Sequence, residues 1–425
     1  MSCSGKTVAV FSVVLLVLAG CILPPSSGTT VLSTGGTADQ QELVLLRGEH
    51  ILYFNATVDV EPFNLRYSFP PEYQYQIPIY LELINDTTAN IIRYTIDDDT
   101  NFPNKVVNFT LADMNESESK MIHFYLWVLV ENHDYSDMPE KADMPKRSEL
   151  PEEVKQWLAP SKVVQSRRIL IKLRSKQLRG LRNDLIRYAE KVAKFTKNHR
   201  YGLFLLQLYT GLFGPQDAMH TLRRNGECPG RSHLGCALFR TQNVPARVVM
   251  ATPHYEFWFQ MHYMSEYYLP GYGWILTEVH KGNTPVEPKE QIIMRVCYPE
   301  DEENTHSDYI FSRMTGLESW FWFDDLRVFP YFVNCTAGSK NNMFVEAETL
   351  TDDQTANNAV FTTKLVLNLY QTYQGVNLSS EDQGYFENAT YFQKKACEEL
   401  QQSDVPGYII FMDTAYDEYK KIADK

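Results

Sequence analysis

The segment GECPGRSHLGCALFRTQNVPARVV, residues 226–249, constrains the fold more than any other part of the chain. Apolar residues such as Leu234 and Ala237 recur at helical spacing, and Asn243 tolerates the left-handed conformation of a helix end. The pattern predicts a helix that begins immediately after Cys228 and stops at Asn243. Cys228 would then lie at the positive end of the helix dipole, where backbone amides favour a thiolate and can receive an oxyanion.

The other cysteines have a different default interpretation. Cys236 lies two turns further along the predicted helix, on an apolar surface. We expect it to be a buried small residue or one half of a disulfide. Beyond residue 21 the chain has an odd number of cysteines, so that four could pair and one would remain. They are Cys228, Cys236, Cys297, Cys335 and Cys397. Their connectivity stays open, and all five could be reduced in an anoxic environment.

The stretch HYMSEYYLPGYGWILTE, residues 262–278, predicts a β-hairpin, because two alternating runs flank the turn PGYG. His262 would project from the first strand and Glu278 from the second. A cysteine nucleophile needs such a base and a group that orients it. Glu266 also lies near His262 in sequence, but four residues along one strand separate the two by about 13 Å. Glu278 is therefore the expected partner, within reach across the hairpin.

These elements together resemble the transglutaminase-like superfamily. Its pattern has Gly-x-Cys at a helix start, an Arg, a Gly-Ile-Pro-Ala-Arg run, a His-x-x-x-Glu strand, and Pro-Gly-x-Gly-Trp before an acidic residue. Here Cys228 precedes Arg240 by twelve residues and Pro245 by seventeen, and NVPAR stands where the family has its Pro-Ala-Arg run. The register continues through His262, Glu266, Pro270, Gly271, Gly273 and Trp274. The resemblance covers about residues 180–280 of the chain.

Two positions depart from the family pattern. Tyr263 and Met264 follow the histidine where the family commonly has Ala-Trp, which puts the shape of the acyl-acceptor side in doubt. Glu278 stands where the family usually has Asp, so its carboxylate sits on a stem one methylene longer. Neither departure removes the Cys–His pair.

The resemblance implies a papain-like α+β fold, in which a cysteine-bearing helix packs on an antiparallel sheet that carries the histidine and the acid. It further implies a catalytic triad of Cys228, His262 and Glu278 that needs no cofactor. The thiolate would attack a carbonyl group of a protein or peptide substrate and form a thioester. Water would then give hydrolysis, and an amine would give a cross-link. A non-catalytic surface protein that binds or scaffolds a partner is the alternative.

A metal site is a competing interpretation of the same segment. Cys228, His233, Cys236, His254 and His262 are all possible ligands and lie within thirty-five residues. The Cys-x4-His-x2-Cys spacing, however, is not a recognised zinc pattern. We therefore expect no metal.

The N-terminus predicts export and a lipid anchor. MSCSGK is followed by the apolar run TVAVFSVVLLVLAG, which has the length of a signal peptide. The tetrad LAGC resembles the lipobox of prokaryotic lipoproteins, so residues 1–20 would be removed and Cys21 lipidated and attached to the membrane. Residues 21–43, rich in Pro, Gly, Ser and Thr, would form a flexible extracytoplasmic tether. An ordinary cleaved signal peptide and an uncleaved anchor are the alternatives.

The glycosylation sequons bear on the prediction of export, and the net charge bears on the kind of partner. Seven Asn-x-Ser/Thr sequons suit an exported, glycosylated protein, although each alone is a weak signal. They begin at Asn55, Asn85, Asn108, Asn115, Asn334, Asn377 and Asn388. The net charge of −13 gives no support to a nucleic-acid partner, which would need a basic surface.

Three folded regions are expected after the tether. Five short alternating runs predict a β-sandwich of immunoglobulin-like size over residues 44–140. The transglutaminase-like region would occupy residues 150–335, and residues 341–425 would be mainly helical. Between residues 155 and 200 lie fourteen Lys and Arg residues. The helical spacing there favours the solvated face of core-packed helices over a membrane or polyanion site.

Two further stretches carry weaker expectations. The acidic loop PEDEENTHSD, residues 299–308, could hold calcium through Asp301, Glu302, Glu303 and Asp308, but it lacks the spacing of a known calcium loop. An exposed, solvated turn is the expected structure. The aromatic run WFWFDD, residues 320–325, could line a substrate groove or form a core element.

Overall fold

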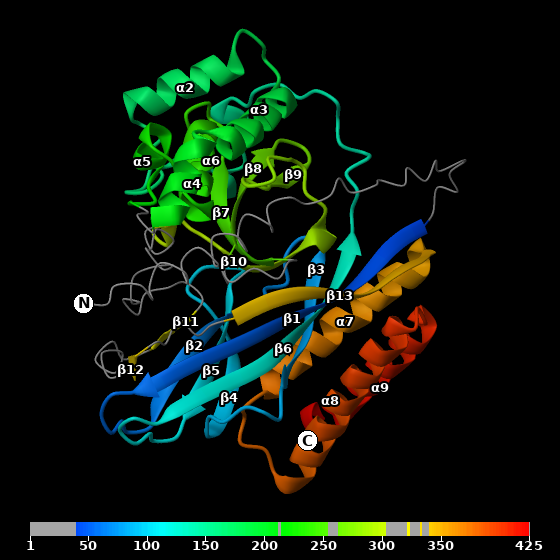
Figure 1. Cartoon of the computed structure of the whole chain (residues 1–425). Coiled ribbons are helices and arrows are strands. Elements are labelled where there is room, and N and C mark those ends of the chain that lie inside the picture. Colours follow the sequence, from blue (N-terminus) through cyan, green and yellow to red (C-terminus); the bar gives the residue numbers. More distant parts are fainter. Residues whose placement is uncertain are drawn as a thin grey trace, which may run out of the picture.

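The computed structural model describes residues 40–210, 214–253, 262–302, 321–323, 332–333 and 340–424. They form two lobes (Figure 1). The sandwich lobe comprises residues 40–132 together with the described residues from 321 onward, and the core lobe comprises residues 147–302. Several expectations lie outside the described residues: Cys21 and its lipid, most of the tether, the sequon at Asn334, and Cys335.

The sandwich lobe is built from two antiparallel sheets. One has the order β12-β1-β6-β3, with β13 paired to β1 beside β12, and the other has the order β11-β2-β5-β4. The strands are β1 (Gln40–Ala56), β2 (Phe63–Phe69), β3 (Gln76–Leu83), β4 (Ile91–Asp98), β5 (Lys105–Leu111), β6 (Ser119–Asn132), β11 (Phe321–Phe323), β12 (Phe332–Val333) and β13 (Lys340–Asp352). Of these, β2 is not predicted by the alternating pattern of the sequence.

The C-terminal region is mainly helical, as predicted, but it begins with the strand β13, which the sequence pattern did not predict. It pairs with β1 from Gln40↔Asp352 to Ile51↔Lys340, while the other edge of β1 pairs with β6. The ion pair between Arg47 and Glu346, 2.6 Å long, joins β1 and β13. The core lobe is therefore inserted, in chain order, between strands that share one sheet.

Three helices cover the outer face of this sheet: α7 (Asp353–Tyr373), α8 (Ser380–Gln401) and α9 (Val405–Ala423). They lie at the end of the molecule away from the core lobe (Figure 1). Tyr370 of α7 accepts a hydrogen bond from the backbone N–H of Leu81, and Gln393 of α8 donates to the carbonyl oxygen of Ile79. Because the sheet is covered on both faces, most residues of β1 and β6 are buried, without a strict alternation.

The core lobe places its α-helices on one face of a third antiparallel sheet, with strand order β10-β7-β8-β9. This arrangement is the predicted α+β class, with a cysteine-bearing helix on an antiparallel sheet. The elements are η1 (Arg147–Glu149), η2 (Glu152–Leu158), α2 (Ile169–Arg179), α3 (Leu185–Asn198), α4 (Tyr201–Thr210), α5 (Ala218–Arg223), α6 (Cys228–Arg240), β7 (Ala246–Pro253), β8 (His262–Leu269), β9 (Gly273–Thr277), η3 (Pro288–Glu290) and β10 (Gln291–Val296).

Helix α6 packs closely on β8. The ring of Phe239 stacks on that of Tyr267 with centroids 5.0 Å apart. At Gly235 a Cβ atom would lie 3.3 Å from Oγ of Ser265, so even an alanine there would be in tight contact with the strand. This contact sets the distance between the cysteine-bearing helix and the strand that carries His262.

Side-chain amides of the sandwich lobe cover the outer edge of β10. Gln76 accepts from the N–H of Ile293 at 2.9 Å and donates to its carbonyl oxygen at 2.8 Å. Asn104 makes the same pair of bonds with Val296, each 2.8 Å long. An open strand edge would otherwise present unpaired backbone groups, so these amides fix the two lobes to each other.

Within the basic stretch, α3 follows the predicted pattern of a core-packed helix with a solvated face. On α3 the buried residues include Leu185, Ala189 and Val192, whereas Arg187 and Lys194 are exposed. Among the described residues, no helix combines the length and apolar character needed to cross a membrane.

Candidate active site

Cys228 is the first residue of α6, one position earlier than the predicted helix start. The helix ends at Arg240, and Asn243 adopts the expected left-handed conformation with φ of 61°. Gly226 explains the Gly-x-Cys pattern, because a Cβ atom there would lie 2.6 Å from Oγ1 of Thr221. Glycine at this position therefore lets the loop directly before Cys228 pass close to α5. Cys228 is 8% exposed.

His262 and Glu278 meet across the predicted hairpin. Strands β8 and β9 pair Ser265 with Thr277, so Glu278 follows the last residue of β9 and lies diagonal to His262. Nε2 of His262 is 2.5 Å from Oε2 of Glu278, and the other carboxylate oxygen accepts from the backbone N–H of His280 at 2.7 Å. Both oxygens of the fully buried carboxylate are therefore engaged.

Charge pairing dominates the electrostatics of this cluster. Burial by itself lowers the pKa of His262. The Glu278 carboxylate and a side-chain hydrogen bond with Cys228 outweigh this effect and raise the pKa to about 10. Burial raises the pKa of Glu278, and the charge of His262 outweighs this and brings it to about 2. At neutral pH the structure thus holds an imidazolium between a carboxylate and the sulfur at the helix N-terminus.

Two further charged or titratable residues, Arg231 and His280, stand outside the family pattern. Arg231 is 2% exposed, donates to the carbonyl oxygens of Gly226 and Lys197, and interacts electrostatically with Cys228. Its position three residues after Cys228, on the same helix face, was the available sequence signal. Burial, followed by the charges of Arg231 and His262, lowers the pKa of His280 to about 3, so that ring is neutral.

Glu266 lies in a separate cluster. Its carboxylate accepts hydrogen bonds from Nε of Arg247 and from the hydroxyl of Tyr73, each 2.8 Å long. The Arg247 guanidinium lies 3.7 Å from the ring centroid of Trp274 and 4.9 Å from that of Trp157. Arg247, Glu266 and Trp274 of the family pattern therefore hold the sheet against the sandwich lobe, which supplies Tyr73.

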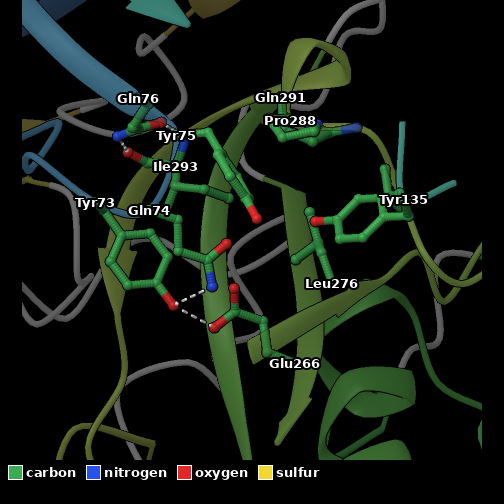
Figure 2. A pocket seen from close by; sticks show the side chains of 11 residues that line it. Tyr73, Gln74, Tyr75, Gln76, Tyr135, Glu266, Leu276, Pro288, Gln291 and Ile293 are labelled. Atoms are coloured by element: carbon green, nitrogen blue, oxygen red, sulfur yellow. Dashed lines mark hydrogen bonds between the residues drawn. The ribbon is translucent and has the colours of Figure 1, made fainter. Parts of the chain in front are cut away.

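A pocket beside this cluster lies between the two lobes (Figure 2). Figure 2 shows the Tyr73 hydroxyl between the Glu266 carboxylate and the side-chain amide of Gln74, which also donates to the carbonyl oxygen of Trp274. Cys228 and His262 are not among its lining residues. The pocket belongs to the junction of the lobes and not to the candidate active site.

Glu302 overturns the expectation of an exposed acidic turn. It is fully buried and forms an ion pair with Arg240, which also donates to the carbonyl oxygens of Ala159 and Ala246. Asp301 accepts from Asn101 and from the backbone N–H of Tyr298. The partners Arg240 and Asn101, distant in sequence, explain why Glu302 and Asp301 are not solvated as the local composition suggested, whereas Glu300 is exposed. Glu303 and Asp308 lie outside the described residues.

The remaining cysteines in the described part of the chain carry thiols and not disulfide bonds. Cys236, Cys297 and Cys397 are almost completely buried, and burial raises the pKa of each thiol. A thiol that resists ionisation is a poor nucleophile. Among the cysteines in the described part of the chain, Cys228 alone lies at a helix N-terminus with a histidine as its hydrogen-bond partner.

The other candidate residues are scattered. Nδ1 of His233 lies 2.5 Å from the carbonyl oxygen of Gln216, and His254 lies outside the described residues. Within the described ranges no three His, Cys, Asp or Glu side chains are grouped as metal ligands. Residues 321–323 of the aromatic run form β11, which pairs with β2 in the sandwich lobe.

The sequons differ in exposure. Asn85, Asn115, Asn377 and Asn388 are exposed, whereas Asn55 and Asn108 lie within strands and are half-buried. Tyr263 and Met264, which depart from the family pattern, are fully buried in two different cores. They therefore contribute to packing on both faces of β8.

A match to a family model supports the resemblance suggested by the motif. A model of the transglutaminase-like superfamily matches residues 172–279, which include Cys228, His262 and Glu278. A structure search matches a protein described as a candidate cysteine protease from Cytophaga hutchinsonii, at 14% identity and a TM-score of 0.47, covering 74% of this chain and 92% of that one. No curated protein matches the chain.

Replacing Glu278 by Gln should lower the pKa of His262, because the charge and the charged hydrogen-bond acceptor that raise it are removed while burial remains. In the unchanged protein the imidazole should stay protonated until the pH rises through about 10. NMR titration of the ring should show the transition displaced to lower pH in the variant. Glu290→Gln, which removes an exposed partner of Lys281, is the control. An identical His262 titration in both variants would contradict the assigned pair.

Replacing Glu266 by Gln should destabilise the fold, because it leaves the buried Arg247 guanidinium without its counter-ion. The expected loss of unfolding free energy is about 3–5 kcal/mol, measured by denaturant unfolding. Glu290→Gln, at an exposed pair, should cost less than about 1 kcal/mol. Equal losses in the two variants would show that the Arg247–Glu266 pair does not hold the lobes together.

Proposed function

Because residues 172–279 form a transglutaminase-like superfamily core, we propose that the protein is a cysteine-dependent acyl-transfer enzyme acting on protein or peptide substrates. The single observation that carries the proposal is the chain of contacts from Cys228 through His262 to Glu278. A nucleophile, a base and an orienting carboxylate in this order are the parts that thioester chemistry requires.

The proposed reaction begins with attack of the Cys228 thiolate on a carboxamide or peptide carbonyl carbon. The N-terminal end of α6, including the N–H of Cys228 itself, stabilises the oxyanion, whereas Pro229 has no N–H to offer. Collapse of the tetrahedral intermediate breaks the C–N bond, and His262 donates its proton to the leaving amine. A thioester on Cys228 remains.

The thioester is then resolved by a second nucleophile. Neutral His262 takes a proton from water or from a primary amine as it attacks, and the thiolate leaves. Water yields a carboxylic acid, as in a protease or amidase, and an amine yields a cross-linked amide. Glu278 keeps His262 oriented and stabilises its charged form in both halves of the reaction.

Intact mass spectrometry with peptide and glutamine-containing substrates, with and without a primary amine, tests the proposal. Cys228→Ala should abolish turnover, by at least about 1000-fold, while the fold persists. Cys236→Ala should act mainly on stability, with a loss of about 0.5–3 kcal/mol. If folded Cys236→Ala lost turnover while Cys228→Ala kept full activity, Cys228 would not be the nucleophile. Failure of a thiol-reactive probe to label Cys228 near neutral pH would favour a non-catalytic scaffold.

We further propose that the protein is held at the extracytoplasmic side of a membrane by a lipid on Cys21, as the LAGC tetrad suggests. Cys21→Ser should release the protein from membranes that have been washed with high salt, or block its processing. Western blots of fractionated cells measure the partition. A normally processed Cys21→Ser protein that stays with the washed membranes would refute the anchor.

A further inference from the structure

Helix α2 and its flanking residues carry an unusual concentration of positive charge. Residues 167–183 contain seven cations and no acid, in a chain whose net charge is −13. The cations are Arg167, Arg168, Lys172, Arg174, Lys176, Arg179 and Arg182. Figure 1 shows α2 on the periphery of the core lobe, at the far end from α7, α8 and α9. This segment is therefore a local basic surface on an acidic protein.

The same helix exposes large apolar side chains. The exposed fractions are 67% for Ile169, 40% for Leu170 and 57% for Leu173, and Leu181 in the following loop is fully exposed. Scattered exposed leucines need no explanation, but a group within one and a half helical turns and the adjoining loop does. A solvated charged face, as expected from the sequence, does not account for these residues.

The apolar residues occupy the side of α2 that faces away from the protein. At about 100° per residue, Ile169, Leu170 and Leu173 fall within an arc of about 100°, opposite the buried Ile171 and Ser175. Exposed cations, among them Lys172 and Lys176, border this arc. Apolar residues in the centre with cations beside them are the arrangement of a helix that lies in a membrane interface.

The inner face of α2 is fixed to the core lobe. Oγ of Ser175 donates to the carbonyl oxygen of Leu238 in α6 at 3.0 Å, and Arg179 donates to Gln242. The outward face is therefore presented by a rigid helix and does not require α2 to rotate. Leu238 lies near the C-terminal end of α6, so a surface bound to α2 would lie at the opposite end of α6 from Cys228.

We infer that α2 docks on an anionic lipid surface. The exposed cations of this segment, such as Arg168, Lys172 and Lys176, complement anionic headgroups at about 1 kcal/mol for each cation near the surface, and the apolar arc enters the acyl boundary. A nucleic acid or an acidic polysaccharide would use the cations but not the exposed leucine and isoleucine side chains. The inference rests on neither the proposed catalysis nor the lipid on Cys21.

Hydrogen exchange and vesicle flotation of the full-length Cys21→Ser chain test the inference. Vesicles of phosphatidylcholine alone are compared with vesicles that also contain phosphatidylglycerol. We expect protection of residues 167–182 with the anionic vesicles only, and loss of this protection at high salt. Exchange is measured peptide by peptide, so any contact made by the apolar residues 7–20 is separated from contact through α2.

Two sets of variants separate the contribution of the cations to vesicle binding from that of the apolar side chains. Arg168→Glu/Lys172→Glu/Lys176→Glu should weaken binding to anionic vesicles at least about 100-fold, since each cation contributes about fivefold. Leu170→Ser/Leu173→Ser should weaken it about 10-fold even at low salt. Arg93→Glu/Lys141→Glu/Arg147→Glu changes three exposed residues elsewhere by the same net charge and should bind normally. Circular dichroism checks that each variant is folded.

Three outcomes would overturn the inference. The first is equal weakening by the α2 charge variant and by its matched control, which would indicate a nonspecific charge effect. The second is normal binding by Leu170→Ser/Leu173→Ser, with heparin competing as well as lipid, which would indicate a soluble polyanion. The third is loss of binding only when exposed residues of α4 are replaced, as in Leu206→Ser/Tyr209→Ser, which would assign the lipid contact to α4.

Discussion

The arrangement of the lobes depends on the contacts of the buried Arg247 guanidinium. It is paired with Glu266 and lies against the rings of Trp274 and Trp157, and the hydroxyl of Tyr73 from the sandwich lobe binds the same carboxylate. Removing a charge from water is costly, and the cost is recovered here only because the counter-ion, the aromatic faces and the hydroxyl are all present. The family motif thus divides into residues that hold the lobes and residues that meet at the cysteine.

The second group also consists of buried charges, but they are arranged differently. His262 has partners on both sides, the thiol of Cys228 and the carboxylate of Glu278, and both raise its pKa. Glu278 is in turn held by the backbone N–H of His280. The carboxylate that fixes the imidazole therefore cannot move to another partner without losing two hydrogen bonds. Such rigidity keeps the ring in one orientation for both proton transfers of an acyl-transfer reaction.

Local patterns in the sequence predicted the parts of the site that depend on neighbours along the chain. The hairpin over residues 262–278 follows from alternation and a glycine-rich turn, and the position of Cys228 follows from helical spacing. Contacts between distant segments were not predictable in this way. The burial of Glu302 against Arg240, the contact of Tyr73 with Glu266, and the pairing of β13 with β1 depend on partners that no local period encodes.

The pairing of β1 with β13 also affects the order in which the protein can assemble during synthesis. Strand β1 is made first, yet one of its edges is completed only when residues 340–352 have emerged, after the whole core lobe. A nascent chain folds from its N-terminus, so the helices and sheet around Cys228 can form while that edge of β1 is still open. An exposed edge of this length favours intermolecular pairing. This chain is therefore most prone to aggregate before residue 340 has been synthesised. Slow translation up to that point, or truncation before it, would prolong the exposure of the β1 edge.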